Sequence, residues 1–278
     1  MHFPPRRLRV LKVKLNERIA DVEEGTTLFA LRDAVKPNAD VVIINGAAVG
    51  EDTPLADGDE VCLIKRGETP SAAELESLMA ARHTPGVHEK VKAATVGIAG
   101  LGGLGSAIAI ALARVGIGKL IVADFDVVEP SNLNRQQYFV DQLGLLKTEA
   151  LIENLQKVNP YVEVVAHPVK LTPENIFPIF ADVDVMIEAF DQADQKLMLM
   201  ETFISKKKDV PFIAASGLAG FGQEETIKVT KMGNNVYIVG DLETEARPGC
   251  GLMAPRVGIV ASMQANLALR LIVEGGTQ

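Results

Sequence analysis

A glycine-rich segment, Gly100-Leu-Gly102-Gly103-Leu-Gly105, lies between an apolar stretch and a predicted helix. Glycines in a turn between a strand and a helix let the backbone N–H groups at the helix start surround a phosphate. Asp124 ends the next apolar stretch, where a carboxylate can accept hydrogen bonds from a ribose. These residues alone fit NAD, FAD or ATP equally well. Glycines needed only for tight helix–strand packing are the alternative interpretation.

The polar segment that follows Asp124 favours a nucleotide whose phosphates react. Residues 124–137 read DFDVVEPSNLNRQQ and carry four candidate groups, Asp126, Asn132, Arg135 and Gln136. Lys147 comes one short loop later, at a predicted helix start. An enzyme that transfers hydride needs no such cluster beside the ribose, whereas departing pyrophosphate requires positioning and cancellation of charge. The segment therefore predicts phosphate chemistry.

Alternating strands and helices must position these residues. Strands are predicted at 96–99, 120–123, 162–166, 183–187 and 212–215, and helices at 104–115, 141–158, 174–180 and 195–207. Such alternation is typical of a parallel sheet with helices on both faces. Asp191 follows the fourth strand, at the carboxyl edge where ligands bind in such sheets. A late antiparallel hairpin (227–231 and 236–240) and a C-terminal helix complete a Rossmann-like, doubly wound α/β unit.

The first 66 residues form a separate pattern. Strands are predicted at 8–15, 19–22, 41–44 and 60–65, with a helix at 26–35 and a hairpin turn at Asn45-Gly46. This order describes a small β-grasp module. A helix follows at 70–83, with Ser71 and Glu74 spaced as a capping box. We thus expect three parts: a β-grasp domain at 1–66, a helical connector at 67–94 and a nucleotide-binding domain at 95–278.

Composition excludes several classes of protein. The formal net charge is −8, which argues against a general nucleic-acid binder, and 47% hydrophobic with 23% charged residues is ordinary for a soluble globular protein. The two cysteines, Cys62 and Cys250, form no CxxC pair, so neither a disulfide scaffold nor a thiolate zinc site is expected. Residues 93–113 lack charge, but the central glycines argue against a membrane span. The N-terminus lacks the features of a signal peptide. We expect a cytoplasmic protein.

The sequence resembles the ThiF/MoeB/HesA adenylyltransferases, which are related to ubiquitin-activating enzymes. The resemblance runs from about Arg82 to Glu274 through GLGGLGS, ADFDVVEPSNLNRQ, GLLKTEAL, Asn159-Pro160 and EAFDQADQK. The first 66 residues look like a ThiS-type sulfur-carrier domain. This fusion, together with RHTPGVHEK and GLMAPRVG, is most like a ThiF subgroup that carries such a domain.

The resemblance implies ATP-dependent adenylation of the C-terminal glycine of a ThiS-like sulfur carrier, in the thiazole branch of thiamine biosynthesis, with ATP and Mg²⁺ as cofactors. By resemblance, the nucleotide is held by Gly100, Gly102, Gly103 and Gly105. Asp124 binds ribose, Asp126 lines the site and Asp191 holds Mg²⁺. The phosphates are contacted by Asn132, Arg135 and Lys147, with Gln136 nearby. Arg82 matches an arginine that reaches across a homodimer. Adenylation of a molybdopterin-type or cysteine-type carrier, or a non-catalytic nucleotide-binding scaffold, are the alternatives.

Three departures from the family pattern stand out. The paired CxxC motifs of many relatives are absent, so no structural zinc is expected. Cys250 is the single candidate thiol of the catalytic domain, and a passive role suits it equally well. The β-grasp module continues through Arg66-Gly67-Glu68 into a helix and offers no free carboxylate, so we expect it to organise carrier docking and to remain unmodified. Spacing assigns no role to Arg256.

Overall fold

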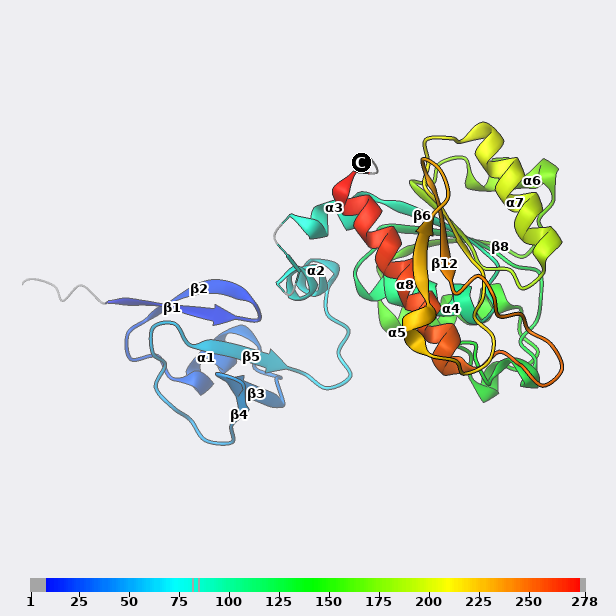
Figure 1. Ribbon diagram of the computed structural model, residues 1–278. Helices are drawn as coiled ribbons and strands as arrows, with labels where there is room; N and C mark the ends of the chain where they lie inside the picture. Colours follow the sequence, from blue (N-terminus) through cyan, green and yellow to red (C-terminus); the bar gives the residue numbers. More distant parts are fainter. Residues whose placement is uncertain (1–8, 82, 85, 276–278) are drawn as a thin grey trace, which may run out of the picture. The chain divides into compact units, whose positions relative to one another are not determined.

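The structure, a computed structural model, describes residues 9–81, 83, 84 and 86–275. The chain divides into two compact units, Met1–His83 and Thr84–Gln278 (Figure 1). The predicted connector is thus divided between them, and its first helix belongs to the N-terminal unit.

The N-terminal unit is the β-grasp fold predicted from the sequence. Its five-stranded sheet has the order β2 (Arg18–Glu23), β1 (Val10–Leu15), β5 (Glu60–Ile64), β3 (Val41–Ile44) and β4 (Ala47–Ala48). β1 and β5 are parallel, whereas the other pairs are antiparallel. The inward residues of β1 and β5 pack against Leu28 and Leu31 of α1 (Leu28–Val35). Alternation along the strands thus places one sheet face against one helix.

Helix α2 (Ala72–Ala80) starts at the predicted cap and packs against the β-grasp unit. Ser71 Oγ accepts a hydrogen bond from the N–H of Glu74 at 3.3 Å. Arg18 fastens the helix, because its Nη2 donates to the carbonyl of Ala73 at 2.6 Å and its Nε to Ser77 Oγ at 3.0 Å. The helix is shorter than the predicted range of 70–83.

The C-terminal unit is built on a seven-stranded sheet. The strand order is β11 (Lys228–Lys231), β12 (Val236–Gly240), β10 (Phe212–Ala215), β9 (Val185–Glu188), β6 (Thr95–Ala99), β7 (Lys119–Ala123) and β8 (Glu163–His167). Neighbouring strands are parallel except β11, which pairs antiparallel with β12 as the predicted hairpin requires. The fold class predicted from the sequence is confirmed.

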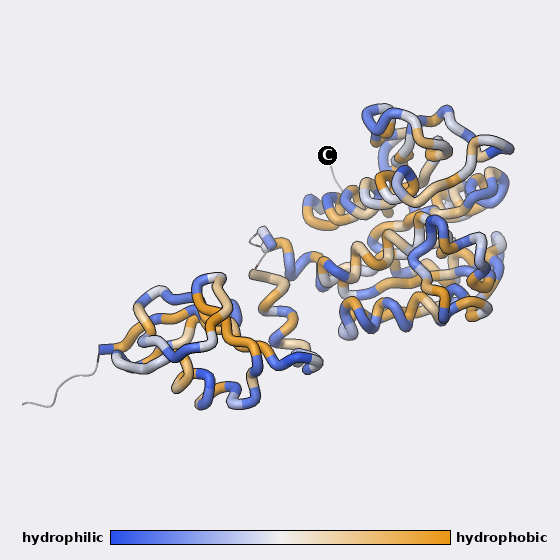
Figure 2. Tube along the Cα trace, turned by 90° about the horizontal axis from the view of Figure 1, so that it is seen from below, coloured by the Kyte–Doolittle hydropathy of each residue, from blue (hydrophilic) through white to orange (hydrophobic). Residues whose placement is uncertain are grey.

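Helices cover both faces of this sheet (Figure 1). One hydrophobic cluster includes buried residues of α3 (Val87–Ala93), α4 (Gly103–Arg114), α5 (Lys147–Val158) and α8 (Ala254–Glu274). The other includes residues of α6 (Pro173–Phe180) and α7 (Ala193–Lys206). Hydrophobic and hydrophilic residues alternate along the helices (Figure 2), as expected for helices with one inward face.

Two helical segments differ from the sequence prediction. α3 was not predicted, because seven residues give little periodicity. The helix predicted at 141–158 begins only at Lys147, because Gly144 adopts a φ of +87° and separates it from a short 3₁₀ turn, Val140–Gln142. As the sequence predicts, the uncharged stretch at residues 93–113 contains strand β6, the glycine turn and most of α4, after the last residue of α3. Among the described residues one helix, α8, is long and apolar enough to cross a membrane, yet it packs against α3 and α4 through buried residues.

Candidate functional site

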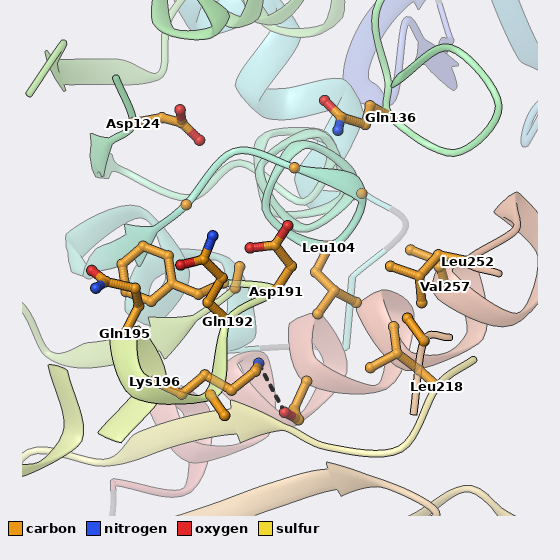
Figure 3. A pocket seen from close by; sticks show the side chains of 18 of the residues that line it. Leu104, Asp124, Gln136, Asp191, Gln192, Gln195, Lys196, Leu218, Leu252 and Val257 are labelled. Atoms are coloured by element: carbon orange, nitrogen blue, oxygen red, sulfur yellow. Dashed lines mark hydrogen bonds between the residues drawn. The ribbon is translucent and has the colours of Figure 1, made fainter. Parts of the chain in front are cut away.

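A cavity of about 610 Å³ opens at the carboxyl ends of β6, β7, β9 and β10. β6 lies between β7 and β9, so the strands that follow it in sequence are added first on one side of β6 (β7 and β8) and then on the other (β9 and β10). Open α/β sheets bind ligands at such a switch point. Asp124 and Gln136 lie on one side of the cavity, Asp191 lies near its middle, and Lys196 and Leu218 lie on the other side (Figure 3).

The glycine turn forms the floor of the cavity. Gly100 has a φ of +91°, and a Cβ there would lie 2.8 Å from the carbonyl oxygen of Ala189, so this position requires glycine. Gly102 and Gly103 line the cavity where α4 begins. The first N–H groups of a helix have no partner within the helix and can bind an anion. Gly105 does not line the cavity. A Cβ there would lie 1.9 Å from the Gly100 carbonyl, so Gly105 permits the close packing of turn and helix.

Asp124 holds the glycine turn while it faces the cavity. Its Oδ2 accepts from the N–H of Leu101 at 2.6 Å, and its Oδ1 accepts from the N–H of Asp126 at 2.8 Å. Burial raises the pKa of Asp124 above its usual value, although Lys147 and these two N–H groups oppose the rise. Tyr138 fixes the same turn, since its hydroxyl donates to the Leu101 carbonyl at 2.8 Å. Sequence analysis missed Tyr138.

Two of the predicted cations reach the cavity. Lys147 is almost buried, and its Nζ lies 2.7 Å from Oδ2 of Asp126, whose side chain is 49% exposed. Arg135 also lines the cavity, and its Nη1 donates to the Ser131 carbonyl at 3.2 Å and to Asn134 Oδ1 at 2.8 Å. Each guanidinium has five donors, so most of those on Arg135 remain available to a phosphate.

The two predicted amides differ in position. Gln136 lines the cavity, and its buried Oε1 has no hydrogen-bond partner among the residues that the structure describes. A buried polar atom without a partner is costly, which is consistent with a donor supplied by a ligand. Asn132 is also buried but does not line the cavity, and its Oδ1 accepts from the N–H of Glu129 at 3.1 Å. Asn132 therefore shapes the turn. Arg82 lies outside the described residues.

Asp191 is the candidate for holding a divalent cation. It is exposed in the cavity, and within the described part of the chain its carboxylate makes no hydrogen bond or ion pair. The described residues contain no group of three His, Cys, Asp or Glu side chains that could hold a metal. Mg²⁺ commonly binds one or two carboxylates together with substrate phosphates and water. One unpaired carboxylate beside a phosphate site fits that pattern.

A buried ion pair on the cavity wall escaped sequence analysis. Glu188 ends β9 with a fully buried side chain, and both of its carboxylate oxygens accept from Lys196 Nζ, at 2.9 and 3.0 Å. Lys196 also donates to the Ala215 carbonyl at 3.0 Å, while the N–H of Phe190 donates to Glu188 Oε1 at 2.6 Å. Burial raises the pKa of Glu188, and Lys196 opposes that rise. The pair joins β9, β10 and α7, and Asp191 lies in the loop between β9 and α7.

Cys250 does not line the cavity. It is half-buried, its backbone pairs with Arg247, and a Cβ on Gly220 would lie 3.1 Å from its Sγ. The thiol therefore packs against the loop at Gly220.

Comparison with known proteins identifies a family for each part of the chain. Residues 76–278 match the ThiF family, and residues 11–67 match the ThiS-like ubiquitin family. The chain is 31% identical over 195 residues to the adenylyltransferase and sulfurtransferase UBA4 of Candida glabrata, covering 66% of this chain and 43% of the relative. The Kluyveromyces lactis protein of the same name is 34% identical over 191 residues, with 66% and 42% covered. The chain thus spans less than half the length of these relatives.

Solved structures support the fold. The tRNA N6-threonylcarbamoyladenosine dehydratase TcdA of E. coli superimposes with a TM-score of 0.66 in its complex with AMP and 0.65 in its complex with ATP. The identities are 23% and 24%, and each match covers 75% of this chain and 98% of the other. The family predicted from the sequence is confirmed: this chain belongs to the ThiF family and carries an N-terminal ThiS-like ubiquitin domain.

Proposed function

We propose that the chain adenylates the C-terminal glycine of a ThiS-like sulfur carrier with ATP, in the assembly of the thiazole of thiamine. One observation carries the proposal. A single cavity combines the start of α4, the cations Arg135 and Lys147, and the unpaired carboxylate of Asp191. The curated relatives are named adenylyltransferases, and the fused ThiS-like domain favours a ThiS-like carrier.

The reaction needs charge control more than acid–base catalysis. One oxygen of the carrier's C-terminal carboxylate bonds to the α-phosphorus of ATP, and the bond from that phosphorus to the oxygen bridging to the β-phosphate breaks. Pyrophosphate leaves with that oxygen, and the carrier retains AMP as an acyl adenylate. A carboxylate is already a nucleophile, so Arg135, Lys147 and the first turn of α4 act by positioning and by balancing negative charge.

Mg²⁺ completes the proposal. Asp191 would hold the cation together with phosphate oxygens of ATP, and the cation would neutralise charge on the departing pyrophosphate. Asp124 would accept hydrogen bonds from the ribose, and Gln136 Oε1 would receive a donor from the ligand. We further propose a cytoplasmic homodimer in which Arg82 of one subunit assists the site of its partner. A protein that sediments as a monomer while it catalyses exchange at full rate would contradict the dimer.

The deciding experiment is ATP–pyrophosphate exchange with a panel of purified thiamine-type, molybdopterin-type and cysteine-type carriers. The control for each is the same carrier without its terminal glycine. We expect Mg²⁺-dependent exchange with the intact thiamine-type carrier. Exchange only with another type would correct the carrier, whereas ATP binding without any exchange would favour the scaffold. Thermal stabilisation by NAD in place of ATP would refute adenylation, since a ligand stabilises the protein that binds it.

The fused β-grasp unit is not the substrate in this proposal. The segment after β5 is held by the unit itself: Asp40 accepts from Lys65 Nζ and from the N–H of Arg66, both at 3.0 Å, and Lys36 pairs with Glu68 at 2.8 Å. Mass spectrometry after incubation with ATP and a sulfur donor should find this unit unmodified. An adenylate or thiocarboxylate on a fragment ending near Gly67 would show that the chain is processed into a working carrier.

A further inference from the structure

Two loops form the wall of the cavity opposite Asp124 and Gln136. The first follows β10 and contributes residues 215–219, and the second follows β12 and contributes residues 244–246. Leu252 and Val257 border this wall where it meets Gly103 and the segment of Asn134 and Arg135. In Figure 3, Leu218, Leu252 and Val257 lie together on one side, away from Asp124. What fixes the two loops to each other is not evident from the sequence.

Arg256, in the first turn of α8, joins both loops. Its Nη1 donates to the carbonyls of Gly222 at 2.9 Å and Gln223 at 3.3 Å. Its Nη2 donates to Thr226 Oγ1 at 3.2 Å and lies 2.6 Å from Asp241 Oδ2. The side chains of Arg256 and Asp241 are 5% and 7% exposed. The planar guanidinium thus holds three residues of the first loop and one of the second.

Asp241 extends the connection to the residues that line the cavity. Its Oδ1 accepts from the N–H groups of Glu243 and Thr244, both at 2.8 Å, and Thr244 Oγ1 donates to its Oδ2 at 2.8 Å. Thr244 Oγ1 in turn accepts from the N–H of Ala219 at 3.2 Å. Gly217 has a φ of +78°, and a Cβ there would lie 2.0 Å from Asp241 Oδ1. The loops are therefore packed against the carboxylate at contact distance.

The chemistry of this wall differs from that of the nucleotide side. Small residues predominate at 215–217, 219 and 246, and Leu252 and Val257 add apolar surface. Its one charged side chain among the described residues that line it is the exposed Glu245, which repels phosphate. The adjacent Lys196 donates to Glu188 and to the Ala215 carbonyl. The wall therefore suits an extended peptide segment with small, uncharged side chains.

We infer that Arg256 is a positioning residue which, through Asp241, holds residues 215–219 and 244–246 as the wall that receives the C-terminal tail of the carrier. The inference rests on the proposed function and assigns the second substrate to one side of the cavity. Backbone hydrogen bonds from Asp241 to Gly217 at 2.9 Å and from Leu242 to Ser216 at 3.2 Å also join the loops. Without Arg256 the loops would keep these bonds but lose the guanidinium that fixes residues 222–226 to Asp241, so the tail would bind weakly while the nucleotide side stayed intact.

The test compares Arg256→Met with Arg256→Lys and with Arg270→Met, an exposed arginine of the same helix. Because Arg256→Met leaves Asp241 buried without its cation, Thr226→Val serves as a further variant that keeps the ion pair. Pyrophosphate exchange gives the KM for the carrier, calorimetry gives the Kd for ATP, and hydrogen exchange reports on the two loops. We expect Arg256→Met to raise the carrier KM at least tenfold and to accelerate hydrogen exchange at residues 216–227 and 241–246. The Kd for ATP should stay within twofold of the wild-type value. Thr226→Val should show a smaller change in the same direction, Arg256→Lys should recover part of the carrier affinity, and Arg270→Met should match the wild type.

Several results would overturn the inference. An unchanged carrier KM in Arg256→Met, or an ATP Kd that rises as much as the carrier KM, would show that Arg256 does not position the tail-binding wall. If Arg256→Met does not fold, an unchanged carrier KM in Thr226→Val has the same meaning. If none of the carriers supports pyrophosphate exchange by the wild type, the proposed function fails and the tail assignment fails with it. Altered hydrogen exchange in Arg256→Met would still establish Arg256 as the anchor of the loops.

Discussion

Replacing Lys196 with Met should destabilise the C-terminal unit strongly, because it leaves the buried carboxylate of Glu188 without its cation. The two oxygens of Glu188 lie 2.9 and 3.0 Å from Lys196 Nζ. At about 3 Å and an effective dielectric constant of about 20, the Coulomb attraction is about 5 kcal/mol. Removing one partner of a buried pair typically costs about 3–5 kcal/mol. For a unit of this size we expect the Tm to fall by about 10 °C or more.

Intrinsic tyrosine fluorescence can follow this unit alone. The chain has no tryptophan, and its three tyrosines, Tyr138, Tyr161 and Tyr237, all lie within Thr84–Gln278. Urea unfolding of the full chain would therefore report the C-terminal unit without a signal from the β-grasp unit. Lys157→Met, which changes an exposed lysine near the end of α5, is the matched control and should alter the free energy of unfolding by less than about 0.5 kcal/mol.

The pH dependence gives the sharper test. Burial raises the pKa of Glu188, and loss of Lys196 removes the main opposing influence. A carboxyl group with a raised pKa in the folded state costs stability above that pKa, and protonation relieves the cost as the pH falls. The defect of Lys196→Met should thus shrink toward acidic pH, and Glu188→Gln/Lys196→Met should recover part of the loss. The explanation by a buried, unpaired Glu188 would be refuted if Lys196→Met lowered the free energy of unfolding by less than about 1 kcal/mol. It would also be refuted if Glu188→Gln/Lys196→Met were as unstable as Lys196→Met.

Three further outcomes are expected. Asp191→Ala should lower pyrophosphate exchange by at least about 100-fold, because the proposed Mg²⁺ ligand is lost. It should change the free energy of unfolding by less than about 0.5 kcal/mol, because the exposed carboxylate has no partner among the described residues. Near-normal exchange with Mg²⁺ would exclude the metal role. Arg135→Ala should reduce exchange by about 100- to 1,000-fold while carrier binding measured by calorimetry persists, because phosphate charge is left unbalanced in the transition state. Burial would raise the pKa of Asp241, but hydrogen bonds from Thr244, Glu243 and Arg256 outweigh it and hold the pKa at about 2. The ionised carboxyl then contributes roughly 2 kcal/mol above its ordinary pKa, which is lost as the pH falls through about 2. Asp241→Asn should therefore be less stable than the wild type at pH 5, with a smaller difference near pH 3, when tyrosine fluorescence is followed in urea.

The sequence predicted the parts of the site whose geometry is local. The glycine turn and Asp124 follow a strand directly and Asp191 follows one within three residues, and parallel strands bring their carboxyl ends to one edge of the sheet. The β-grasp unit could also be predicted, because β1 and β5 alternate between exposed and buried residues and Thr27 caps α1, accepting from the N–H of Ala30 at 3.3 Å. Local chemistry determines these features.

The features that escaped prediction depend on tertiary contacts. Glu188 and Lys196 begin and end the segment EAFDQADQK, which points to the family, but nothing in its spacing shows that the two side chains pair across the loop between β9 and α7. Arg256 and Asp241 meet only after a loop folds between β12 and α8. Asn132 was predicted to contact phosphate, but its side chain holds the turn at Glu129. In each case the residue type shows that the side chain can form hydrogen bonds or ion pairs, but the tertiary structure determines which group it pairs with.

Two lysines of the cavity differ in how readily a ligand could recruit them. The partner of Lys147 is Asp126, whose side chain is 49% exposed, so its carboxylate can return to water while the lysine turns to a phosphate. The partner of Lys196 is Glu188, whose side chain is fully buried, so releasing the lysine would leave an unpaired charge in the interior. Breaking a buried pair costs about 3–5 kcal/mol, mainly because a charge is left buried without a partner. Opening the Lys147 pair avoids that cost, because Asp126 returns to water and a phosphate takes its place beside the 7% exposed lysine. The burial of the acid, more than the position of the base, therefore leaves Lys147 more readily available than Lys196 to the ATP of the proposed reaction, while Lys196 stays bound to Glu188 and to the Ala215 carbonyl.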